Sequence, residues 1–169
     1  TGLGANFGFL GAGWFLGIPM PVWISAIVVA LAVLLTNKTK LGRYIYAIGG
    51  NENAARLSGI NISKVKIIVY SLAGVLAAVG GLIITSRLDS AQPNAGFTYE
   101  LDAIAAVVIG GTSLSGGKGK IMGTVLGAII IGVLNNGLVL LDVSPFWQQV
   151  VKGAVILLAV IIDKSGSKQ

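Results

Sequence analysis

A short run of polar residues occupies positions 49–60, between two long apolar stretches. Asn51 is suited to cap a helix, because its side-chain oxygen accepts a hydrogen bond from a free amide of the first turn. Glu52 favours the positive end of the helix dipole, and Gly59 suits the left-handed residue that ends many helices. The run therefore predicts a compact capped helix that presents polar groups to another protein. An ordinary solvated loop helix is the alternative.

Two adjacent amides, Asn135 and Asn136, interrupt a later apolar stretch. Polar groups inside a membrane are costly and usually face a partner helix or a water-filled cavity. Because an amide both donates and accepts hydrogen bonds, it can also bind sugar hydroxyls. The two residues are either interhelical hydrogen-bonding groups or candidates for a translocation path. Lys152, in the last apolar stretch, is expected to extend its ammonium group outward to water.

The sequence lacks the residues that catalysis, metal binding or nucleotide binding would need. It has no cysteine and no histidine, which removes thiolate sites, the commonest general base and the commonest metal ligand. Residues 110–119 are rich in glycine, but a P-loop needs a glycine five positions before Gly117-Lys118 and Ser or Thr after the lysine. Thr112 and Gly119 stand at those positions. No catalytic, cofactor or metal site is predicted, and the chain is not expected to be an enzyme.

The composition is that of a membrane protein. Hydrophobic residues make up 54% of the 169 residues and charged residues only 11%, with a mean hydropathy of +0.87. A soluble domain of this length needs more charge to cover its surface. The predicted fold class is an all-α, polytopic transmembrane helix bundle with about five spans. The expected spans are residues 21–36, 65–85, 101–114, 121–141 and 146–162.

Two of these segments have special features. Residues 101–114 are long enough only for a partial crossing or for a helix broken near Gly110-Gly111. The span at 121–141 carries Gly123 and Gly127, whose small-xxx-small spacing lets two helices approach closely. We expect these glycines to serve helix packing rather than a pore.

The charged residues favour one orientation in the membrane. If the loop at 37–64 lies in the cytoplasm, alternate threading brings almost every lysine and arginine, and the C-terminus, to that side, as the positive-inside rule requires. Basic residues then lie in loops beside the spans rather than in a stripe that would bind nucleic acid. The other side holds Arg87 with Asp89, Glu100 and Asp102. These acids are expected outside the membrane, either solvated or in contact with an external partner.

Several segments together resemble the permease subunits of bacterial sugar ABC importers, and most of all their ribose-transporting members. The similarity is colinear from about residue 17 to 163, and its clearest parts are LGRYIYAIGGNE at 41–52, AARLSGI at 54–60, YELDAIAAVV at 99–108, GGTSL at 110–114 and LNNGL at 134–138. The resemblance implies that residues 1–169 are the C-terminal half of the membrane domain, with a cytoplasmic coupling loop at about 37–64. It further implies an ATPase-coupling helix that contains Asn51, Glu52, Ala55, Arg56 and Gly59. Asn53 departs from the Glu-Ala-Ala pattern of other importer classes.

The same resemblance implies the activity and the partners. It implies a multi-pass subunit of the bacterial inner membrane that translocates a monosaccharide, ribose. It also implies that a separate subunit hydrolyses ATP. The partners are a cytoplasmic ATP-binding cassette subunit, a periplasmic sugar-binding protein, a second permease copy and the lipid bilayer. No cofactor and no nucleic acid are implied.

Two alternatives from other classes follow from the residues. A secondary transporter normally carries an ionisable residue within a span, and no Asp or Glu is expected in the membrane interior here. A channel without an ATPase partner would be satisfied by the glycine-rich spans, but it leaves the capped helix unexplained.

Overall fold

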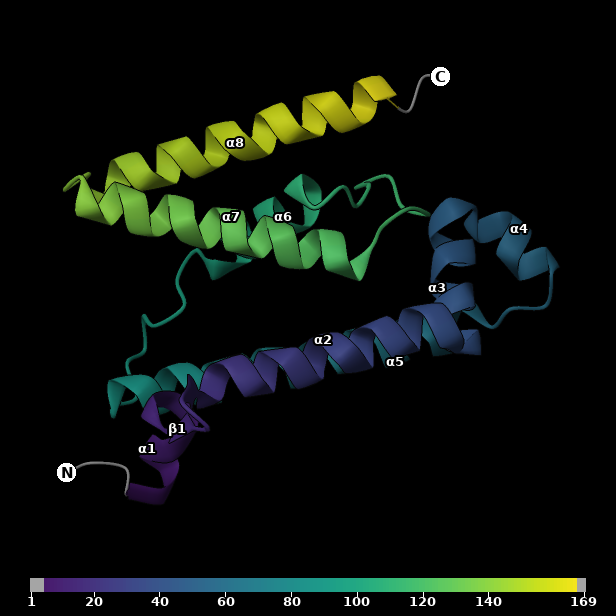
Figure 1. Cartoon of the computed structure of the whole chain (residues 1–169). Coiled ribbons are helices and arrows are strands. Elements are labelled where there is room, and N and C mark those ends of the chain that lie inside the picture. The colour runs from purple at the N-terminus through teal and green to yellow at the C-terminus, as the bar shows by residue number, and fades with distance from the viewer. Residues whose placement is uncertain (1–4, 167–169) are drawn as a thin grey trace. The chain divides into compact units, whose positions relative to one another are not determined.

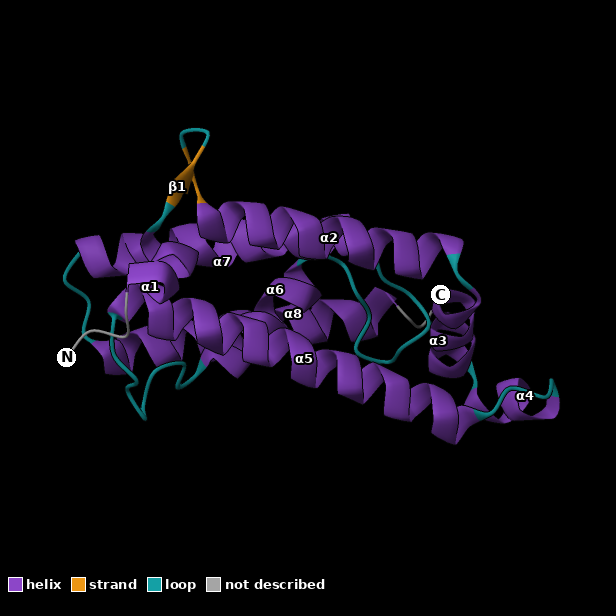
Figure 2. Ribbon diagram, turned by 90° about the horizontal axis from the view of Figure 1, so that it is seen from below, coloured by secondary structure: helices purple, strands orange, loops and turns teal. Residues whose placement is uncertain are grey.

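The computed structural model describes residues 5–166, whose regular secondary structure is helical apart from one small hairpin (Figures 1 and 2). The helices are α1 (Ala5–Ala12), α2 (Met20–Lys38), α3 (Lys40–Gly50), α4 (Glu52–Leu57), α5 (Ile62–Leu88), α6 (Tyr99–Ile109), α7 (Ile121–Leu140) and α8 (Pro145–Gly166). The strands are β1 (Trp14–Phe15) and β2 (Ile18–Pro19). The chain forms two compact units. One holds the described residues up to Tyr44 together with Arg56–Phe97, and the other holds Ile45–Ala55 and the described residues from Thr98 onward.

Three described helices, α2, α5 and α7, are long and apolar enough to cross a membrane. They correspond to three of the spans expected from the sequence. Helix α6 has only 11 residues, which is about 16 Å and therefore shorter than the hydrocarbon core of about 30 Å. It ends at Ile109 with Gly110 as its C-cap, and Gly111 follows with a φ of +80° that stops the helix. The expected break near Gly110-Gly111 is thus present, and the count of about five spans stays a prediction.

In the first unit, α1 packs against the end of α5 and the start of α2 (Figure 2). Ser86 of α5 joins the first pair, because its hydroxyl accepts from Gly11 N at 2.8 Å and donates to the Phe7 carbonyl. The hairpin between α1 and α2 turns at Leu16 and Gly17, whose φ angles of +52° and +78° match the two left-handed positions of a type I′ turn. These contacts fix the start of α2 without packing its apolar length.

Helix α3 was not expected from the sequence, where its residues were part of a loop. Thr39 begins it, because the Thr39 hydroxyl accepts from Gly42 N at 3.2 Å and donates to Leu35 O at 2.7 Å. Gly42 is required at this bend, since a Cβ there would overlap the carbonyl oxygen of Thr36. The sharp bend separates α3 from α2 and leads the chain toward α4.

In the second unit, α6 packs against both α7 and α8 (Figure 1). Its small side chains form the core, with Ala105 and Ala106 buried against Ile131 of α7. The two backbones come together where glycine leaves room, since a Cβ on Gly123 would overlap the Gly110 carbonyl and a Cβ on Gly127 the Ala106 carbonyl. The expectation that these glycines serve packing is confirmed for the α6–α7 pair.

This close approach predicts opposite effects of the same substitution at two glycines of α7. Gly127→Ala is expected to destabilise the full-length permease by about 1–3 kcal/mol, because the added carbon meets backbone atoms that cannot rotate away. Gly132→Ala is the matched control, since a Cβ there meets no atom within 4 Å and alanine favours a helix by about 1 kcal/mol. Unfolding of both variants by denaturant in detergent micelles measures the difference. Equal stability of the two would contradict the packing.

Candidate functional site

Helix α4 has the capped structure that its sequence predicts. The side chain of Asn51 accepts a hydrogen bond from Ala54 N at 2.9 Å, and its carbonyl accepts from Ala55 N at 3.0 Å. Gly59 ends the segment with a φ of +81°, and its N–H donates to the Arg56 carbonyl at 3.0 Å. Both caps are local backbone devices, which explains why the sequence was sufficient to find them.

The surface of α4 is mostly open to a partner. Asn51, Arg56 and Gly59 are exposed, and Glu52 is half-buried. Leu57 is 90% exposed. Ala55 is the exception among the predicted residues, because it is buried at 4% exposure and serves the packing of the helix. The helix therefore exposes most of its residues on one short segment.

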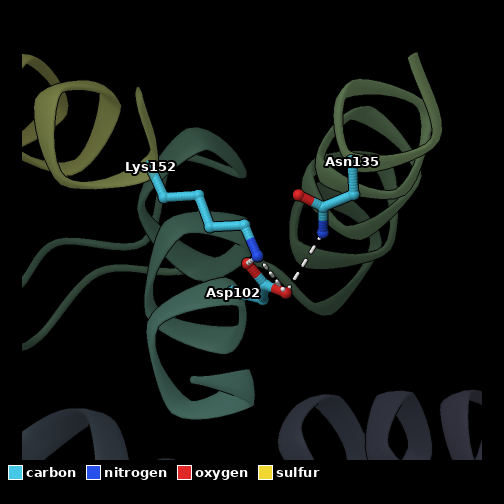
Figure 3. A network of polar contacts seen from close by, with 3 residues as sticks. All are labelled: Asp102, Asn135 and Lys152. Atoms are coloured by element: carbon cyan, nitrogen blue, oxygen red, sulfur yellow. Dashed lines mark hydrogen bonds and ion pairs between the residues drawn. The ribbon is translucent and has the colours of Figure 1, made fainter. Parts of the chain in front are cut away.

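A second polar group lies between three helices of the second unit, where Asp102 of α6 meets Lys152 of α8 and Asn135 of α7 (Figure 3). The Lys152 ammonium lies 2.8 Å from Asp102 Oδ1 and donates a hydrogen bond to Asp102 Oδ2 at 3.0 Å. The Asn135 amide donates to Asp102 Oδ2 at 3.1 Å. The side chains of Lys152 and Asp102 are only 10% and 19% exposed. We call these three residues the polar triad.

The polar triad corrects two expectations from the sequence. Lys152 does not extend to water, and Asp102 is neither a solvated acid nor free for an external partner. A buried, unpaired charge costs several kcal/mol. The Lys152 ammonium is therefore stabilised by the carboxylate of Asp102 on the neighbouring helix α6, and it does not need to reach solvent. Asp102 lies in the first turn of α6, where it packs among the helices of the second unit. Its charge is paired within the chain, unlike the lone ionisable residue of a secondary transporter.

The two adjacent asparagines have different surroundings. The Asn135 nitrogen makes the interhelical hydrogen bond that was one of the alternatives from the sequence. Its side-chain oxygen is buried without a hydrogen-bond partner among the described residues, although an amide oxygen readily accepts. Asn136 is exposed. The sequence did not predict the triad, because Asn135 and Lys152 are 33 and 50 positions away from Asp102. No local sequence pattern pairs residues at such separations.

Several known proteins are similar to this chain. It is 60% identical over 169 residues to the ribose import permease protein RbsC of Bacillus subtilis (strain 168), covering 99% of this chain and 52% of that protein. It is 63% identical over 157 residues to RbsC of Escherichia coli (strain K12), covering 93% and 49%. The xylose transport system permease protein XylH of the same strain is 48% identical over 164 residues, covering 95% and 42%. The chain thus spans about half the length of these relatives.

No solved structure matches the chain. A protein family does match it, over residues 3–160, which include every helix from α1 to α7 and most of α8. Apolar helices long enough to cross a membrane agree with the membership of a transport family. The chain belongs to the family described as branched-chain amino acid transport system / permease component.

Proposed function

We propose that this chain is the C-terminal half of a permease that imports a monosaccharide, ribose, across the bacterial inner membrane. The observation that carries the proposal is the identity of 60% and 63% to two ribose import permeases over almost all of this chain. The lower identity of 48% to a xylose permease favours ribose over xylose. The permease supplies the path, and a separate subunit hydrolyses ATP.

The proposal assigns α4 as the coupling helix of this importer. In this assignment the loop at 37–64 and the C-terminus are cytoplasmic, and Asn51, Glu52, Arg56 and Gly59 contact an ATP-binding cassette subunit while Ala55 supports them from inside. The exposed surface of α4 and the exposed Leu57 support this role. A periplasmic sugar-binding protein and a second permease copy complete the transporter. ATP binding then shifts the equilibrium between the conformational states of the permease. The size of the shift is set by the difference in the ATPase's affinity for these states.

Asn136 and Asn135 are proposed to serve the sugar path together. Asn136 is exposed on α7, where its amide can exchange hydrogen bonds with sugar hydroxyls. Asn135 is anchored through the polar triad, and its unpartnered oxygen can accept from a passing hydroxyl or a water molecule. Asp102 holds Asn135 of α7 in place, and its charge is neutralised by Lys152. This arrangement does not attract an ion, which suits a neutral substrate.

A cysteine at position 57 tests the assignment of α4. Leu57→Cys in the full-length permease, with its ATPase and binding protein co-expressed, is expected to crosslink to the ATPase with a yield that changes with nucleotide. Leu57 suits the experiment because its side chain is 90% exposed and because this chain has no cysteine of its own.

Asn94→Cys is the matched control, since Asn94 is exposed in the loop between α5 and α6, and the proposed orientation has this loop on the other side of the membrane. It is expected to form no crosslink to the ATPase. Labelling of Leu57→Cys from the cytoplasm without any crosslink would contradict an ATPase-coupled permease.

A further inference from the structure

The C-terminal end of α3 and the loop between α6 and α7 are in direct backbone contact. A Cβ on Gly49 would lie 2.7 Å from Gly117 N, and a Cβ on Gly117 would lie 2.8 Å from Gly50 Cα. A Cβ on Gly116 would overlap the Gly49 carbonyl oxygen. Gly116 and Gly117 also have φ angles of +89° and +75°, which favour glycine. We call Gly49, Gly116 and Gly117 the glycine clamp.

A side-chain hydrogen bond reinforces the glycine clamp. The Tyr46 hydroxyl, one helical turn before Gly49, donates to the Gly119 carbonyl at 3.0 Å. The loop is also braced internally, because Ser113 N donates to Lys118 O at 3.0 Å and Gly116 N donates to Ser113 O at 3.2 Å. Contact through backbone atoms leaves no side chain that can rotate to absorb a displacement. The glycine-rich segment that fails as a P-loop is thus a firm contact surface for α3.

The position of the glycine clamp connects α4 to α7. Gly50 directly precedes Asn51, the cap of α4, and the loop runs into α7, where Thr124 N donates to the Lys120 carbonyl at 3.1 Å. Residues Ile45–Ala55 belong to the same compact unit as α6, α7 and α8. At the C-terminal end of α4 the packing is sparse, since Leu57 is 90% exposed and a Cβ on Gly59 would meet no atom within 4 Å.

We infer that the glycine clamp, reinforced by Tyr46, is the contact that transmits displacement of α4 to α6 and α7. The inference rests on the proposed function and adds to it the route by which docking at α4 reaches the helices that carry Asn135 and Asn136. Tyr46, Gly49, Gly116 and Gly117 act as positioning residues: they touch neither sugar nor nucleotide. Loosening the clamp therefore uncouples transport from ATP hydrolysis and leaves docking intact.

Two neighbouring glycines provide the test. Gly49→Ala forces the clamp apart, whereas Gly50→Ala is the matched control, because its Cβ would lie 4.0 Å from Gly117 Cα, an ordinary contact. Each is combined with Leu57→Cys in the full-length transporter in proteoliposomes, where uptake, ATP hydrolysis and crosslinking are measured. For Gly49→Ala we expect sugar transported per ATP to fall about tenfold or more, with the nucleotide-dependent crosslink retained. Gly50→Ala is expected to keep both.

Tyr46→Phe is the second variant and decides the test if Gly49→Ala is not inserted into the membrane. It removes only the hydrogen bond to Gly119 and is expected to lower the sugar transported per ATP, whereas Tyr44→Phe, on the exposed Tyr44 of the same helix, is expected to leave it unchanged. Normal transport per ATP in both Gly49→Ala and Tyr46→Phe would overturn the inference. If Leu57→Cys forms no crosslink to the ATPase when the glycine clamp and Tyr46 are unchanged, the proposed function is contradicted instead.

Discussion

Lys152→Met is expected to destabilise the permease by about 3–5 kcal/mol, because it leaves the carboxylate of Asp102 buried without its opposite charge. Methionine fills a similar volume and makes no cavity, so the loss reports the charge. After the substitution, Asp102 keeps only the hydrogen bond from Asn135 at 3.1 Å. The measurement is the free energy of unfolding of the full-length permease in detergent micelles. Asp102→Asn alone is expected to cost a similar amount, since it leaves the ammonium unpaired.

The double variant Asp102→Asn with Lys152→Met separates pairing from packing. Both charges are then gone, while an amide oxygen at position 102 still accepts from Asn135, so we expect a cost of about 1 kcal/mol or less. The double-mutant cycle gives the coupling energy of the pair directly. Lys118→Met, at an exposed lysine, controls for the loss of one positive charge and is expected to change stability by less than about 0.5 kcal/mol. Additive losses in the double variant would contradict a buried ion pair.

The sequence was sufficient where the structural signal is local. The apolar runs that became α2, α5 and α7 can be recognised by their length and hydropathy. The cap at Asn51 and the left-handed Gly59 act within one turn of α4, so their residue types were decisive. The spacing of Gly123 and Gly127 likewise predicted close packing, although it did not say that α6 was the partner.

The sequence was insufficient where partners come from distant segments. Lys152 was expected to reach water because nothing near it in the sequence could pair with it, and its partner Asp102 is 50 positions away. The contact between Gly49 and Gly117 is equally remote and involves no side chain. Helix α3 could have been found from the sequence, since Leu41, Ile45 and Ile48 recur at helical spacing while Lys40, Arg43 and Gly50 occupy the opposite positions.

Glu52→Lys and Gly59→Arg are expected to abolish uptake while the permease still inserts into the membrane. Glu52 lies in the first turn of α4, where the dipole favours an acid by about 0.3–1 kcal/mol; the helix therefore survives the reversal, and the larger loss is of docking. Reversal of a charge that a docked partner buries costs about 2–5 kcal/mol, enough to lower occupancy of the complex by a large factor. Uptake of labelled ribose by cells that depend on the variant permease measures the loss, and immunoblotting of the membrane fraction measures insertion.

Conservative substitutions at the same two positions distinguish lost docking from a melted helix. Glu52→Gln removes the charge without reversing it and is expected to keep partial uptake. Gly59→Asn retains the left-handed φ of +81°, which asparagine tolerates, and is expected to keep nearly full uptake because a Cβ at that position would meet no atom within 4 Å. Arginine at position 59 combines backbone strain with a long side chain on the docking surface. If Glu52→Lys and Gly59→Arg both transport normally, α4 is a solvated loop helix and the coupling assignment is wrong. If Gly59→Asn fails as completely as Gly59→Arg, the loss of uptake comes from close contact of the partner at residue 59 rather than from the backbone conformation there.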